Sequence, residues 1–225
     1  MRNKTSTELA VIAKVDVSEI AALAPGTAVH SKGRKRVQEI ITTATRVLAF
    51  EGYSAFTMRN IAAKMGISLR NLQYYFQTKS DLFQAVVEQM LRSELASGRM
   101  AVDHARLSPM DRFKKFIDYS IRDNQDPLIR GFQFELWALA TRDRFAAKCR
   151  DRMTGMYCEF ILKLVQPLTP DLPLAQQRQK AAVILALLQG VPLILGKGVN
   201  INFSTGNLQG RLREEILQIV RVVRT

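Results

Sequence analysis

The sequence predicts an all-α fold, and three observations support this prediction. Apolar residues recur every three or four positions over most of the 225 residues, which is the spacing of one helix face. No long stretch alternates apolar and polar residues in the way that a half-buried strand does. Ser, Thr and Asp residues stand where the apolar patterns begin, as N-caps of helices do. We therefore expect a helical chain, with a small N-terminal domain and a larger C-terminal one.

Residues 1–32 precede the first strong helical pattern and predict a flexible N-terminal arm. They are poor in aromatic residues, and Pro25 with Gly26 ends the one piece, Leu9 to Leu23, that could form a helix. Two interpretations stay open. The arm reaches into a minor groove, as the basic arms of homeodomains do, or it is a leader without such a role.

The first predicted helix runs from Arg34 to Glu51 and ends at Gly52. Its apolar face is formed by Val37, Ile40, Ile41, Ala44, Val47 and Leu48. We expect this helix to pack across the motif that follows and to hold it in place. The basic residues at its start, Lys35 among them, are candidates for contacts with DNA phosphates.

The stretch Thr57–Leu82 predicts two short helices joined by a tight turn, then the start of a third helix. Thr57 caps the first short helix, and Ser68 caps the second. Gly66 follows the first helix, at a position where a left-handed backbone costs least in glycine. This arrangement of two helices about a glycine turn is that of a helix-turn-helix.

The second short helix has an inner apolar side and an outer polar side. Leu72 and Phe76 lie four residues apart and share the inner face. The outward or flanking residues are Leu69, Arg70, Asn71, Gln73 and Tyr74. In a helix-turn-helix this helix enters the major groove, where Arg bonds guanine and Asn or Gln bonds adenine. The outer residues are therefore candidates for reading bases, although a three-helix packing unit with a solvated outer face has the same spacing.

From about Arg34 to Leu91 the chain resembles the N-terminal domain of the tetracycline-repressor (TetR) family of bacterial regulators. The residues that carry the resemblance are Ile40, Ala44, Phe50, Gly52, Thr57, Ile61, Ala62, Met65, Gly66, Ile67, Ser68, Leu72, Tyr75, Phe76, Lys79 and Leu82. The resemblance implies binding to double-stranded DNA, with Thr57, Tyr75 and Lys79 on phosphates. Arg70 stands where the family often has Gly, and Gln73 where it most often has Tyr, so the bases that are read stay open.

The predicted domains are a helix-turn-helix DNA-binding domain at residues 33–82 and a ligand-sensing and dimerisation domain at residues 83–225. Thr78 and Asp81 fit a capping box. This box opens a helix of about residues 78–97, which connects the two domains.

Helix starts and one loop divide the second domain. Ser108 and Asp126, each followed by Pro, begin two central helices. A loop with three prolines, residues 167–173, precedes two long helices of about residues 174–195 and 208–223. In the TetR family two C-terminal helices of each subunit form a four-helix dimer interface, so the resemblance implies a homodimer. Either a dimer interface or a monomer core explains the apolar stripe of Ile184, Leu185, Leu188, Leu195, Leu212, Ile216, Ile219 and Val220.

Aromatic residues cluster in the central helices, where residues 132–153 also resemble TetR members grouped with the choline-responsive repressors. That likeness does not make choline the ligand. The family keeps its effector cavity between these helices, so we expect Phe116, Phe134 and Trp137 to line one, although a plain core also suits them. Such a wall suits a mostly apolar ligand held by few polar groups, for which Arg130 and Glu135 are candidates.

The composition agrees with a nucleic-acid partner. A net charge of +13 and a pI near 10.1 suggest a polyanionic partner. The excess of basic residues extends over both predicted domains, so the charge supports DNA binding without locating it. The hydrophobic content of 47% excludes a disordered chain.

No metal, cofactor or catalytic centre is expected. Cys149 and Cys158 lie nine residues apart, a spacing that fits two thiols on one helix but neither a zinc site nor a redox pair. His30 and His104 are isolated from each other. The stretch Gly190–Gly198 has one residue too many between its glycines for a phosphate-binding loop and lacks a hydroxyl after its Lys. We therefore expect a protein that is not an enzyme.

No segment is expected to cross a membrane. The longest apolar run, Ala181–Leu195, contains Gln189 and Pro192 and falls short of the ~20 residues that a bilayer needs. Lys14 and Asp16 interrupt the N-terminal apolar stretch, so no secretory signal is expected. The cysteine usage makes a reduced cytoplasm the expected compartment.

Together these features predict a dimeric DNA-binding transcriptional regulator, a repressor that a small, mostly apolar ligand releases from a palindromic operator. An activator or a ligand-independent regulator is the alternative within the same class. A helical adaptor or an enzyme that retains the domain is the alternative from another class. Selective binding to duplex DNA distinguishes the regulator from this last pair.

Overall fold

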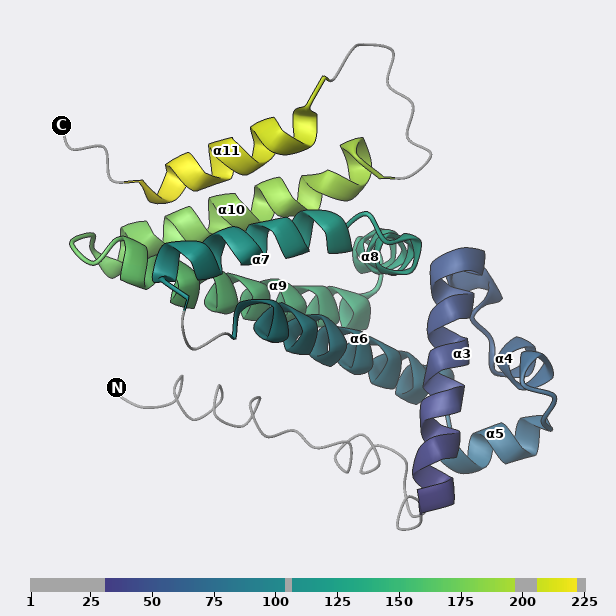
Figure 1. Cartoon of the computed structure of the whole chain (residues 1–225). Coiled ribbons are helices and arrows are strands. Elements are labelled where there is room, and N and C mark those ends of the chain that lie inside the picture. The colour runs from purple at the N-terminus through teal and green to yellow at the C-terminus, as the bar shows by residue number, and fades with distance from the viewer. Residues whose placement is uncertain (1–30, 104–106, 197–205, 222–225) are drawn as a thin grey trace. The chain divides into compact units, whose positions relative to one another are not determined.

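The computed structural model describes residues 31–103, 107–196 and 206–221, and every regular element within these ranges is a helix (Figure 1). The predicted all-α class is confirmed. The contacts between Cα atoms divide the chain into two compact units, Met1–Met90 and Leu91–Thr225. Nearly all of the predicted arm, residues 1–30, lies outside the described residues.

The N-terminal unit contains three helices and the start of a fourth: α3 (Ser31–Ala55), α4 (Met58–Lys64), α5 (Leu69–Tyr75) and α6 (Lys79–Val102). Gly52 interrupts the helical geometry of α3, with φ 82° and ψ 172°. Glycine adopts this conformation readily because it has no Cβ. The predicted end of the first helix at Gly52 is therefore confirmed.

The core of the N-terminal unit draws on all four helices. Its fully buried side chains include Ile40, Ile41, Leu48, Phe56, Ile61, Leu72, Phe76 and Leu82. The rings of Phe56 and Phe83 meet edge to face with centroids 5.9 Å apart, which ties the end of α3 to the first turns of α6. The two short helices thus rest on a rigid support.

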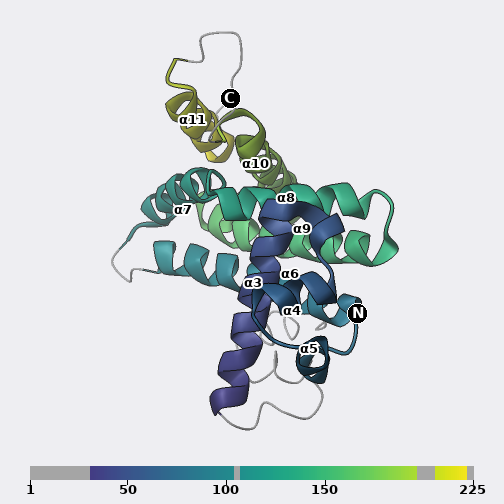
Figure 2. The same ribbon diagram turned by 90° about the vertical axis from the view of Figure 1, so that its right-hand side faces the viewer.

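The C-terminal unit contains the rest of α6 and the helices α7 (Pro109–Asp123), α8 (Pro127–Ala140), α9 (Arg144–Val165), α10 (Leu174–Ile194) and α11 (Leu208–Val220), with a 3-10 turn η1 (Gln166–Leu168). The predicted caps of the two central helices are confirmed. The Ser108 hydroxyl accepts a hydrogen bond from Asp111 N at 3.1 Å, and the Asp126 carboxylate accepts one from Leu128 N at 2.8 Å. Helices α8 and α9 lie side by side, as do α10 and α11 (Figure 2).

Helix α10 carries apolar side chains on two faces. The stripe considered for a dimer interface is mostly core of the C-terminal unit, since Ile184, Leu185 and Leu188 are buried together with Ile216 and Val220 of α11. The other face of α10 is exposed. Among the described residues nine large hydrophobic side chains are exposed, and five of them lie on α10: Leu174, Val183, Leu187, Leu193 and Ile194.

Neither cysteine forms a disulfide. Cys149 and Cys158 both lie on α9 and are half-buried, as the spacing predicted. Within the described ranges no group of three or more His, Cys, Asp or Glu side chains could hold a metal ion. None of the helices described is long and apolar enough to span a bilayer.

Candidate functional site

The turn between α4 and α5 has the caps that the sequence predicted. The Thr57 hydroxyl accepts a hydrogen bond from Asn60 N at 3.2 Å, and the Ser68 hydroxyl accepts one from Asn71 N at 3.1 Å. Gly66 has φ 64°, which ends α4 in the left-handed conformation. These contacts fix the direction of α5 relative to α4, as a helix-turn-helix requires.

The start of α6 is fixed by the predicted capping box. Thr78 N donates to Asp81 Oδ2 at 2.9 Å, and Asp81 N donates to Thr78 Oγ1 at 3.1 Å. Both bonds satisfy backbone donors that the first turn of a helix leaves unpaired.

Helix α5 separates its side chains into a buried set and an exposed set. Leu72 and Phe76 have no exposed surface. The exposed side chains are those of Arg70, Asn71, Gln73 and Tyr74, while Leu69 is half-buried. Tyr74 is 60% exposed, which is a large exposed fraction for an aromatic side chain. This exposed face, called the reading face below, presents a cation, two amides and a phenol, which are groups that can bond base edges.

The side chains predicted to contact phosphates differ in their exposure and in the contacts that they make within the protein. Lys35 is an exposed side chain of α3. Thr57 accepts its capping bond through one lone pair and keeps its O–H as a donor for a phosphate. Tyr75 is half-buried, and its ring meets that of Tyr74 edge to face with centroids 5.2 Å apart.

Lys79 has a role in the fold that its position in the sequence did not indicate. Its Nζ lies 3.6 Å from the centroid of the Tyr53 ring and donates a hydrogen bond to Tyr53 O at 3.5 Å. Partial burial lowers the pKa of the Lys79 ammonium below its ordinary value. A phosphate that contacts Lys79 would therefore meet an ammonium already held in place.

Arg59 is a further candidate that the motif did not single out. It is exposed in the first turn of α4, as Arg70 is in the first turn of α5. The helix dipole disfavours a cation at either position, since the N-terminal end of a helix is positive. A basic residue in both first turns is thus the signal in the sequence that could have identified Arg59.

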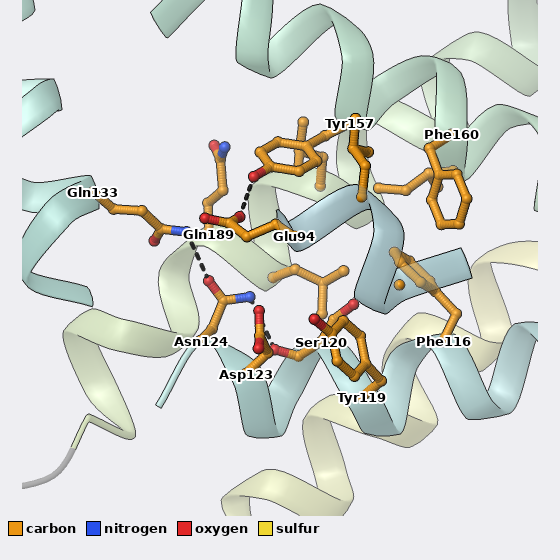
Figure 3. A pocket seen from close by; sticks show the side chains of 15 residues that line it. Glu94, Phe116, Tyr119, Ser120, Asp123, Asn124, Gln133, Tyr157, Phe160 and Gln189 are labelled. Carbon is orange, nitrogen blue, oxygen red and sulfur yellow. Dashed lines mark hydrogen bonds between the residues drawn. The ribbon is translucent and has the colours of Figure 1, made fainter. Parts of the chain in front are cut away.

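The C-terminal unit holds a cavity of about 60 Å³, to which α6, α7, α8, α9 and α10 all contribute (Figure 3). Its aromatic side chains are Phe116, Tyr119, Tyr157 and Phe160. Its polar side chains include Glu94, Asp123, Asn124 and Gln133. Figure 3 shows Asn124 and Gln133 at the end of the cavity opposite the rings of Phe116 and Phe160.

Glu94 of α6 is held inside this cavity. The Tyr157 hydroxyl donates a hydrogen bond to Glu94 Oε2 (Figure 3). Burial raises the pKa of Glu94 to about 7; the Tyr157 bond lowers it and the charge of Asp123 raises it further. Burial also raises the pKa of Asp123 and, beside Glu94, that of Tyr157. The cavity therefore contains a carboxyl group that titrates near neutral pH.

The three side chains predicted to line a ligand site are not brought to one cavity. Phe116 lines the 60 Å³ cavity. Trp137 lines a smaller concavity that shares Gln133, Tyr157 and Gln189 with it. Phe134 is half-buried, and its ring centroid lies 6.2 Å from that of Trp137. Neither Arg130 nor Glu135 is part of either wall.

Two polar groups of the cavity were missed: Glu94 lies on α6, which was expected to connect the two domains, and Gln133 lies among the aromatic residues of α8. Glu94 follows Met90 by four residues and Leu91 by three, so it shares the buried face of α6. Gln133 is buried between the aromatic residues of α8. A polar residue on the apolar face of a helix was the available signal, because burial of such a group is costly unless it has a role.

Comparison with known proteins places this fold. Residues 40–86 match the family of bacterial regulatory proteins called the tetR family. An uncharacterised HTH-type transcriptional regulator in the dhlA 5′ region of Xanthobacter autotrophicus is 25% identical over 178 residues, which are 75% of this chain and 80% of that protein.

Two solved structures have the same fold at low identity. A TetR-family transcriptional regulator from Rhodococcus sp. superposes with a TM-score of 0.66 at 18% identity, over 85% of this chain and all of that one. A transcriptional regulator from Saccharomonospora viridis in complex with choline gives a TM-score of 0.65 at 16% identity, over 84% and 97% of the two chains. Because the family match covers the capped helix-turn-helix described above, residues 40–86 of this chain form a DNA-binding domain of the TetR-family type.

Proposed function

We propose that this protein is a homodimeric repressor that binds a palindromic operator and leaves it when a small molecule occupies the cavity of the C-terminal unit. The reading face of α5 carries the proposal. Leu72 and Phe76 anchor α5 from beneath, so Arg70, Asn71 and Gln73 are presented on a fixed support. A fixed support favours base readout, because side chains on a rigid helix lose less freedom on binding.

Residue roles follow from this placement. Arg70, Asn71, Gln73, Tyr74 and Leu69 read bases, and Lys35, Thr57, Tyr75, Lys79 and Arg59 contact phosphates. The groups assigned to phosphates are basic or hydroxyl-bearing, and each has exposed or half-buried surface. Phosphate contacts position the protein, and base contacts select the sequence.

The outer face of α10 supports the dimer. Val183, Leu187 and Ile194 recur at helical spacing on that face and are 36–50% exposed. An apolar face of this kind is the usual sign of a protein interface, since a monomer gains nothing from exposing it. Two copies that meet through α10, with α11 alongside, would present two reading faces to successive major grooves.

The cavity supports release by a ligand. A small molecule that prefers one of two conformations of the dimer shifts the population toward it. If that conformation spaces the reading faces wrongly, affinity for DNA falls. The regulator from Saccharomonospora viridis, which has a similar fold, is in complex with choline, and this supports a small-molecule site in the present protein.

Selection of duplexes from a random pool by the purified protein tests the first part of the proposal. We expect a selected site with dyad symmetry and half-sites one helical turn or a multiple apart, roughly 34–36 Å per turn. Enrichment of no duplex, or of a site without a dyad, would contradict it. A reporter gene placed behind the selected site separates a repressor from an activator, since deletion of the regulator raises expression only for a repressor.

A further inference from the structure

The wall of the cavity has a charge opposite to that of the whole protein. The chain carries 33 Lys and Arg against 20 Asp and Glu, yet the fifteen residues around the cavity include Glu94 and Asp123 and no Lys, Arg or His. An anion would be repelled by both carboxylates. The charge of the wall therefore restricts the ligand to a cation or a neutral molecule.

Two buried acceptor atoms in this wall have no hydrogen-bond partner among the described residues: Glu94 Oε1 and Gln133 Oε1. The other polar atom of each side chain does have a partner. Tyr157 donates to the second oxygen of Glu94, and Gln133 Nε2 donates to Asn124 Oδ1 at 3.3 Å. Buried polar atoms are rarely left unpaired, and each unpaired one costs stability. Two open acceptors call for a ligand that brings N–H or O–H donors.

We propose that the cavity binds an organic ammonium ion, with the charged nitrogen against Glu94 and Gln133 and an apolar body against Phe116 and Phe160. This assignment names the ligand class for the sensor of the proposed repressor, but the binding itself does not depend on DNA. An ammonium group supplies several N–H donors and the opposite charge in one small head. The aromatic rings suit its body and, where they face the nitrogen, attract the cation directly.

The geometry of the apolar end favours a compact ligand. The rings of Phe116 and Phe160 have centroids 5.4 Å apart and an interplanar angle of 62°. Gly98 of α6 leaves room beside them, because a Cβ at Gly98 would lie 3.7 Å from Phe160 and 3.8 Å from Tyr119. A cavity of about 60 Å³ holds the head of an amine and part of its body.

A metal ion is a poorer occupant than an ammonium. Only two carboxyl side chains line the cavity, and no group of metal-binding side chains occurs in the part of the chain that the structure describes. Hard cations take six or more oxygen ligands, which this largely aromatic wall does not offer.

Protonation accompanies binding in this arrangement. The titratable groups that face Glu94 are Tyr119 and Asp123 of α7 and Tyr157 of α9, while α8 and α10 contribute the amides of Gln133 and Gln189. Arg150 lines the neighbouring concavity and is paired with Asp151 at 2.6 Å. With a pKa of about 7, Glu94 is protonated in most molecules at pH 6 and ionised in most at pH 8. An ammonium that needs the ionised form therefore displaces the proton at the lower pH.

The test uses calorimetry on the full-length protein without DNA. The three probes, benzylamine, benzyl alcohol and benzoate, share an aromatic ring and differ in the polar group. We expect saturable binding of benzylamine, which stays protonated over this pH range, and binding of benzyl alcohol at least about 10-fold weaker. Benzoate should not bind. In buffers of different ionisation enthalpy, benzylamine binding should release about nine-tenths of a proton at pH 6 and about one-tenth at pH 8.

Two variants and a control identify the groups. Glu94→Gln should weaken benzylamine about 10- to 100-fold, leave benzyl alcohol within about twofold, and abolish most of the proton release. Gln133→Leu should weaken benzylamine less and keep the proton release. The control Asp171→Asn removes one negative charge from an exposed loop and should change neither.

Several results would overturn the proposal. These are equal affinity of wild-type protein for the amine and the alcohol, unchanged amine affinity in Glu94→Gln, or no saturable binding of benzylamine at millimolar concentration. If benzylamine binds as expected yet leaves the operator complex intact, release by a ligand is refuted while the ammonium site stands.

Discussion

Single side chains divide the labour in this protein between holding the fold and contacting partners. On α5 the division is clean, because Leu72 and Phe76 are fully buried and Arg70 is exposed. At Lys79 and Glu94 it is not, since Lys79 contacts the Tyr53 ring and Glu94 accepts a bond from Tyr157, and we also assign each of them a contact with a partner. Predictions for these residues must therefore separate stability from binding.

Arg70 tests base readout. Arg70→Ala should cost about 1–3 kcal/mol at the selected operator and relax the choice at one position of each half-site. Fluorescence anisotropy with operator variants at fixed salt measures both effects. The control Arg142→Ala removes another exposed arginine, from the turn between α8 and α9, and should alter neither. Equal weakening on all duplexes by Arg70→Ala would assign Arg70 to phosphates instead.

Lys79 tests phosphate contact. Lys79→Met keeps an apolar stem over the Tyr53 ring but removes the charge, so affinity should fall on all duplexes alike. The slope of log K against log salt should become shallower by about one. Lys79→Ala should in addition lower the free energy of unfolding by about 0.5–2 kcal/mol, since the contact with the ring is lost. An unchanged salt slope in Lys79→Met would exclude the contact.

Glu94 makes stability depend on pH. Its pKa is about 7 in the folded protein and 4.5 in an ordinary environment, so between these values the folded state binds more protons than the unfolded state. The free energy of unfolding therefore falls as pH rises through this window, by about 3 kcal/mol in total. Glu94→Gln should remove this part of the slope and be the more stable protein at pH 8. Denaturant unfolding from pH 4 to 8 measures it, and parallel curves for variant and wild type would refute the assignment.

Helices are the scale at which the sequence was most informative. Caps at Thr57, Ser68, Ser108 and Asp126 follow from local hydrogen bonds, so they could be predicted without tertiary structure. The glycine turn at Gly66 is equally local. The sequence left open which role the apolar stripe of α10 has, because apolar side chains lie on both its buried and its exposed face and such a pattern cannot tell core from interface.

The outer face of α10 should hold the dimer together. Leu187→Glu places a charge in the middle of the exposed apolar face and should convert the protein to a monomer at micromolar concentration, as measured by sedimentation. The control Gln166→Glu adds the same charge to an exposed polar position of η1, outside α10, and should remain dimeric. If the dimer of Leu187→Glu had an unchanged dissociation constant, the interface would lie on another surface.

At the scale of the whole molecule, the cavity depends on five helices and so on contacts distant in sequence. Phe116 lines its wall, and the aromatic cluster to which Phe116 belongs was visible in the sequence. Glu94, Gln133 and Tyr157 converge only after folding, and no spacing along the chain relates them. A cavity with an acidic wall could therefore not be derived from residue patterns, and an apolar ligand was the natural expectation.

Coupling between the cavity and the operator must be reciprocal. An effector that weakens operator binding by a given factor binds the operator complex more weakly by the same factor, typically about 5–150-fold. Titration followed by the fluorescence of Trp137, the single tryptophan, with and without operator measures the factor. A compound that binds equally in both conditions shifts nothing and is not an effector.

Helix α6 belongs to both compact units without a break, from Lys79 at its first position to Glu94 and beyond. If occupancy of the cavity rotates or tilts α6, a change at one end of this helix can reach the other end without a relay of side-chain contacts. The stiffness of α6 would then be the property that couples the cavity to DNA binding. We expect that a variant with two glycines in the middle of α6 still binds its operator and still binds its amine. In this variant, however, binding of one should no longer change the affinity for the other.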